Sequence, residues 1–107
     1  MCRRAHGAAY VTWFGMAESR ARTVDADGAL RWFPSSAGAE RGFCARCGSS
    51  LFFRSTRWPG ELHIALGTLD GDADRAPTAH VFWETHAGWA SLDPADGLPR
   101  KPSPDVD

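Results

Sequence analysis

Two cysteines at a metal-binding spacing are the clearest chemical feature of the sequence: Cys44 and Cys47, followed by Gly48. Two thiolates separated by a tight turn can bind one zinc ion, and Gly48 eases the backbone through that turn. Redox pairs and buried apolar cysteines share this spacing. A thioredoxin-type pair is expected where a strand passes into a helix, and no helical pattern follows Cys47. The spacing therefore favours zinc and leaves the other two interpretations open.

The remaining ligands of a four-ligand site must come from elsewhere. The other candidate donors are Cys2, His6, His63, His80 and His86. On paper, Cys2 and one histidine complete a site with the cysteine pair. The period-two pattern places His63 on the opposite face of its strand from Leu62 and Ile64, so we interpret it as a polar residue on the less buried face and not as a ligand. His80 and His86 are interpreted as surface or hydrogen-bonded histidines.

The overall composition limits the classes of function. With 107 residues the chain is long enough for one domain, and 12 Lys and Arg against 13 Asp and Glu give a net charge of -1. This balance argues against a nucleic-acid partner. No apolar run approaches the length of a membrane span, and no signal-type stretch follows the first residues, so we expect no membrane partner and a cytoplasmic location. An odd count of three cysteines argues for metal binding or a reactive thiol over a disulfide framework.

Short β-prone runs separated by turn residues predict the elements that position the cysteines. No segment has a sustained helical period, so the sequence predicts a mainly β domain. The predicted strands are 8–16, 30–33, 50–54, 62–66 and 79–84. Residues 35–42 and 68–76 are predicted loops. Residues 92–107, with four of the seven prolines, are predicted to form an irregular tail.

The five tryptophans divide into two groups. Trp13, Trp32 and Trp83 lie in β-prone runs and are predicted to fill a small core. Trp58 and Trp89 lie beside Pro59 and Gly88 in predicted loops, where either could line a pocket.

Five segments, in order along the chain, resemble the zinc-binding family of glutathione-dependent formaldehyde-activating enzymes and centromere-protein-V-like proteins. Residues 1–9 (MCRRAHGAA) resemble the end of the family's CxCxxCRxxxG(A) signature, and residues 41–51 (RGFCARCGSSL) resemble its second landmark. Residues 67–70, 77–82 and 97–99 fit later parts of the pattern. A match that spans the chain in order is more specific than the cysteine pair alone.

The resemblance implies a small, single-domain, mainly β zinc-binding fold with a CxxC knuckle, over residues 1–100 with a tail at 101–107. It implies two Zn²⁺ sites. Cys44 and Cys47 would belong to the structural ion, and Cys2 would be the last ligand of the active-centre ion and a remnant of the catalytic site. Four of the seven expected thiolates would precede Met1, so we expect an N-terminal hairpin to be missing and the true start to lie upstream.

The activity implied by the resemblance is that of a carbon-sulfur lyase, which joins glutathione to formaldehyde as S-(hydroxymethyl)glutathione. Its partners would be a small thiol and an aldehyde. Arg3 and Arg4 could attract the carboxylates of such a thiol, or they are solvated surface charges. We expect the chain by itself to be inactive. The alternatives are a non-catalytic zinc-binding scaffold and a truncated, inactive copy that shares Cys44 and Cys47 between two chains.

Overall fold

The computed structural model describes residues 2–102, which form two compact units. Residues 12–70 make up the first, which we call the sheet unit. The described residues 2–11 and 71–102 make up the second, which we call the terminal unit. Within the described residues, no helix is long and apolar enough to cross a membrane.

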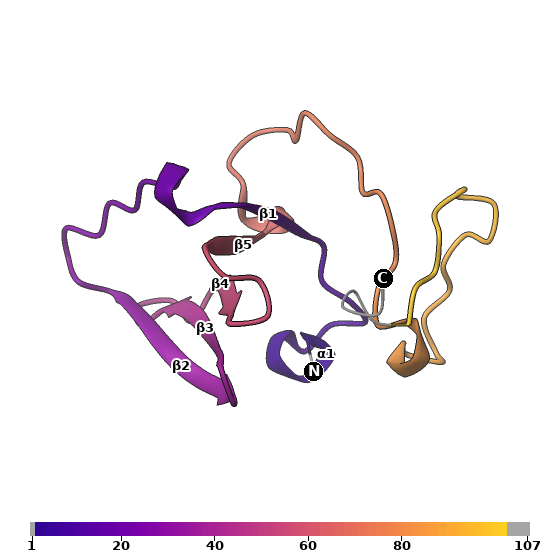
Figure 1. Cartoon of the computed structure of the whole chain (residues 1–107), viewed down its shortest axis with the longest axis horizontal. Coiled ribbons are helices and arrows are strands. Elements are labelled where there is room, and N and C mark those ends of the chain that lie inside the picture. The colour runs from indigo at the N-terminus through magenta and orange to yellow at the C-terminus, as the bar shows by residue number, and fades with distance from the viewer. Residues whose placement is uncertain (1, 103–107) are drawn as a thin grey trace. The chain divides into compact units, whose positions relative to one another are not determined.

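The sheet unit consists of five antiparallel strands in the order β1-β5-β4-β3-β2 (Figure 1). The strands are β1 (Trp13–Ala17), β2 (Leu30–Ser36), β3 (Ala39–Cys44), β4 (Ser50–Ser55) and β5 (Glu61–Ala65). Two short 3₁₀ turns, η1 (Glu18–Arg20) and η2 (Leu66–Thr68), follow β1 and β5. The prediction of a mainly β fold is confirmed.

The predicted loop at 35–42 is wrong, because a tight hairpin joins β2 to β3 at this point. Ser36 pairs with Ala39, and Gly38 between them has φ of +72°, which glycine adopts without strain. A side chain at Gly38 would also collide with Thr56, whose Oγ1 lies 2.5 Å from the ideal Cβ position. Pro34 lies within β2, which is an edge strand, and proline is tolerated in edge strands.

One face of the sheet unit carries the apolar side chains of its central strands. Leu62 is 4% exposed, and its register partner on β1 is Met16. Ile64 is the register partner of Phe52 on β4. The period-two pattern of β5 thus places Leu62 and Ile64 on one face, as predicted from the alternation.

The opposite face carries aromatic side chains around His63, which is less buried than Leu62, as predicted. The His63 side chain is 20% exposed. Its ring lies 5.9 Å from that of Phe53 and 5.3 Å from that of Trp58, centroid to centroid. Burial lowers the pKa of His63, against the opposing effect of Glu61. His63 therefore belongs to a cluster of aromatic side chains, and its burial there favours the neutral form of the ring.

The tryptophans predicted to fill the core divide between the units. Trp13 packs on Phe53, with ring centroids 6.1 Å apart, and Trp32 stacks on Phe52 at 6.0 Å. Trp83 instead belongs to the terminal unit and stacks on His86 at 3.8 Å. Trp13 and Trp32 therefore pack within the sheet unit, whereas Trp83 does not.

The terminal unit contains α1 (Cys2–His6), the 3₁₀ turn η3 (Trp83–Thr85) and irregular chain. The predicted strands at 8–16 and 79–84 are corrected here. The first strand begins at Trp13, and the 79–84 segment forms only a single bridge, between His80 and Arg100, before Phe82 turns into η3 with φ of +53°. Residues 103–107 of the predicted tail lie outside the described residues.

Asp96 binds both His80 and Arg100, and we call these three residues the Asp96 clasp. His80 Nε2 lies 2.8 Å from Asp96 Oδ2, and Arg100 Nη1 lies 3.1 Å from Asp96 Oδ1. The Lys101 amide donates to the His80 carbonyl at 2.7 Å. The hydrogen bond from His80, followed by the Leu98 amide and Arg100, holds the pKa of Asp96 well below its usual range.

We expect the clasp to open in acid. A carboxylate with a depressed folded-state pKa contributes stability that is present above its unfolded pKa of about 4 and is lost as the pH falls below that value. Hydrogen exchange of the Lys101 amide should therefore lose protection on acidification in the native protein. Asp96→Asn should lose protection already at neutral pH and show little further pH dependence.

Asp74→Asn is the matched control, since Asp74 is exposed and has no hydrogen bond or ion pair with the described residues. If Asp74→Asn reduced the protection of Lys101 as much as Asp96→Asn did, the clasp would have no role.

Candidate metal-binding site

The two cysteines lie in one tight turn between β3 and β4. Cys44 is the last residue of β3, and the Gly48 amide donates to the Cys44 carbonyl at 2.7 Å. The Cys44 amide donates to the Ser49 carbonyl at 2.9 Å, which closes the turn. Gly48 has φ of +79°, so glycine suits this position as the sequence suggested. The backbone therefore holds both thiols in one local structure.

Hydrogen bonding favours the ionised form of the Cys47 thiol. Cys47 Sγ lies 3.1 Å from the Ser49 hydroxyl oxygen. This hydrogen bond, followed by those from the Ser49 amide and the Cys44 thiol, lowers the pKa of Cys47. A thiolate is the form that binds metal and reacts as a nucleophile. Ser49 is a hydrogen-bond partner of Cys47 that sequence analysis missed, although its position two residues after Cys47 is evident in the sequence.

The donor set of the turn fits two of the four ligands that zinc takes in structural sites. Cys47 is exposed, Cys44 is half-buried, and neither is in a disulfide. Among residues 2–102, no group of three or more Cys, His, Asp or Glu side chains is placed to hold a metal ion. Within the described sheet unit, the turn thus brings together the cysteine pair and no third donor.

Cys2 lies in the terminal unit at the start of α1, where it is half-buried. Arg3 and Arg4 follow it in the same short helix. His6 is four residues from Cys2, a spacing that places two side chains on one face of a helix.

The other histidines are engaged in contacts of their own. His80 is bound in the Asp96 clasp, and His86 stacks on Trp83 while its Nδ1 hydrogen-bonds the Trp83 carbonyl. His63 packs in the aromatic cluster. The interpretation of His80 and His86 as hydrogen-bonded histidines is confirmed.

Of the two loop tryptophans, Trp58 lines an open cavity together with Glu40 and Arg54. Trp89 is 72% exposed.

The fold and the turn together define a small antiparallel β-sheet protein with a thiol pair at metal-ligand spacing. The family model described as "Glutathione-dependent formaldehyde-activating enzyme" matches residues 1–85, and the chain belongs to this family. Over 55 residues the chain is 34% identical to a protein of Halomonas elongata provisionally named a glutathione-dependent formaldehyde-activating enzyme. That match covers 50% of this chain and 35% of the relative, so the chain spans about a third of the relative's length.

Proposed function

We propose that this protein binds zinc through Cys44 and Cys47 and acts in the joining of a thiol such as glutathione to formaldehyde or a related aldehyde. The observation that carries the proposal is the hydrogen-bonded Cys44–Cys47 turn in a chain whose first 85 residues match the formaldehyde-activating family. The name of the Halomonas elongata relative supports glutathione and formaldehyde as the substrate pair.

The chemistry requires a thiol made nucleophilic and an aldehyde made electrophilic. A bound zinc ion supplies a Lewis acid that polarises the aldehyde oxygen or lowers the pKa of the incoming thiol. Cys44 and Cys47 would hold the structural ion, and Cys2 would belong to the active centre. Arg3 and Arg4 would attract the carboxylates of a glutathione-like thiol, because guanidinium groups bind carboxylates in a bidentate manner.

The number of cysteines limits what the chain can do alone. It contains three cysteines, whereas the family resemblance implies seven thiolates for two ions. We therefore expect the isolated chain to bind zinc through one pair and to give no acceleration of thiol addition.

The test is the exchange rate between formaldehyde and its glutathione adduct, followed by NMR exchange spectroscopy with ¹³C-formaldehyde. The zinc-containing protein purified from its own host is compared with the isolated chain and with buffer. We expect the host protein to raise the exchange rate at least about tenfold, which corresponds to about 1.4 kcal/mol of barrier. A host protein that contains zinc but gives no acceleration would overturn the lyase proposal.

That last outcome would instead favour a non-catalytic zinc-binding scaffold. The observation in favour of this second candidate is that the described residues bring only two thiols together at the turn. Zinc shared between two copies of the chain would then give a stoichiometry of about one ion per dimer, consistent with four-ligand coordination.

A further inference from the structure

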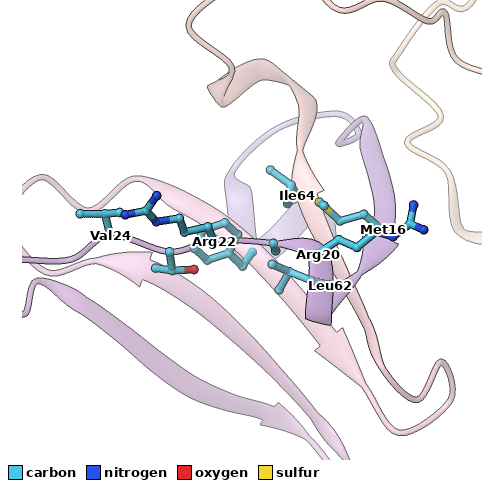
Figure 2. Close-up of a pocket in the computed structure, with 9 residues that line it drawn as sticks. Met16, Arg20, Arg22, Val24, Leu62 and Ile64 are labelled. Carbon is cyan, nitrogen blue, oxygen red and sulfur yellow. The ribbon is translucent and has the colours of Figure 1, made fainter.

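An open groove lies on the apolar face of the sheet unit. Its volume is about 350 Å³, and its floor is formed by Met16, Phe52, Leu62 and Ile64 from β1, β4 and β5. Residues 20–24, from the last residue of η1 onward, form the rim. In Figure 2 the sulfur of Met16 points toward Ile64, and Leu62 lies beside them.

Strand register brings the floor residues together. Met16 is the register partner of Leu62, and Phe52 is that of Ile64. Because side chains alternate along a strand, these four residues share one face of the sheet. Val24 on the rim is 76% exposed, so its side chain does not cover the apolar floor.

The groove carries positive charge with no matching negative charge. Arg20 and Arg22 belong to the rim, and no acidic residue lines the groove. Neither arginine forms a hydrogen bond or ion pair with the described residues, whereas Arg54 pairs with Glu18 and Glu40. Figure 2 shows the two guanidinium groups at opposite ends of the labelled set.

We propose that this groove binds a small carboxylate with an apolar tail. An apolar floor removes the tail from water, and an arginine on the rim supplies paired N–H donors to the carboxylate. The volume is at the lower end of the range for ligand cavities, about 300–1,000 Å³, and fits a small ligand. No groove residue is a cysteine, so binding requires neither zinc nor thiol addition and stands apart from the proposed function.

The test is an NMR titration of the ¹⁵N-labelled chain with octanoate, in the presence of a chelator that removes zinc. We expect saturable shifts in the amides of Leu62, Ile64 and their strand neighbours. Octanol, which lacks the charge, should bind at least about tenfold more weakly, since a hydrogen bond to a charged group contributes about 1.5–3 kcal/mol. Acetate, which lacks the tail, should also bind at least about tenfold more weakly, because each buried CH₂ group contributes about 0.8 kcal/mol.

The double variant Arg20→Gln/Arg22→Gln should weaken octanoate binding at least about tenfold for the same reason. The matched control Arg46→Gln/Arg75→Gln removes the same charge from exposed positions outside the groove and should bind octanoate normally. A second variant, Val24→Ser, changes an exposed rim residue that the fold does not need and should weaken binding severalfold.

Any of the following results would overturn the proposal: no saturable shift with octanoate, octanol binding as tightly as octanoate, or equal weakening by the groove and control double variants. The last of these would mean non-specific attraction to net charge. Shifts confined to residues outside the groove would equally overturn it.

Discussion

Replacing Leu62 with alanine should destabilise the sheet unit by about 2–5 kcal/mol, the usual cost of truncating a buried leucine. Leu62 is 4% exposed and lies on the apolar face of the sheet, where Met16 of β1 is its register partner. The other buried apolar residues in the described part of the chain are Ala65 and Ala87, which have small side chains. The core therefore depends strongly on Leu62. Domains of this size are stable by about 5–15 kcal/mol, so the variant should unfold at a much lower urea concentration. Tryptophan fluorescence during urea unfolding measures the change, because Trp13, Trp32 and Trp58 belong to this unit.

Val24→Ala is the matched control for Leu62→Ala. It also shortens an aliphatic side chain in the sheet unit, but Val24 is 76% exposed, so the free energy of unfolding should change by less than about 0.5 kcal/mol. Similar urea midpoints for the two variants would mean that Leu62 is not the centre of the core.

The sequence predicted the fold best where the pattern reflects local structure. Alternation around Leu62 and Ile64 identified the most buried strand, because a strand with one apolar face must alternate. The segment at 35–42 failed because its small residues resemble a loop in composition, while the hairpin depends on the single positive φ of Gly38. The 79–84 run is rich in β-prone residues, yet only His80 finds a strand-like partner, and β propensity has no effect without a neighbouring strand.

The candidate site was predictable to a similar extent. The turn at Cys44 and Cys47 is encoded by adjacent residues, so its form could be expected from spacing and from Gly48. The environment of His63 could not, because it depends on Phe53 from the neighbouring strand and on Trp58 from a loop. The groove likewise depends on the register between β1, β5 and β4, which no local pattern specifies.

Replacing either Cys44 or Cys47 with serine should lower the zinc affinity of the protein more than about a hundredfold. Loss of an outer partner of a metal ligand already costs about 10–100-fold, and loss of a ligand itself should cost more. Serine preserves the size of the side chain and the backbone turn, whose closing hydrogen bonds involve only main-chain atoms. Competition against a chromophoric chelator under reducing conditions measures the affinity. Cobalt substitution provides a second readout, because sulfur-to-cobalt absorption scales with the number of bound thiolates.

Cys2→Ser is the matched control, because it removes a thiol from the terminal unit and leaves the turn intact. If Cys44 and Cys47 bind one ion as a pair, this variant should retain that ion and its cobalt absorption. Equal loss of zinc in all three variants would instead require Cys2 to bind the same ion, and the assignment of Cys2 to a separate active-centre ion would then be wrong. Retention of zinc by the Cys44→Ser and Cys47→Ser variants would remove the turn from the metal site altogether. The comparison therefore separates the role of the turn from that of Cys2 without relying on catalytic activity.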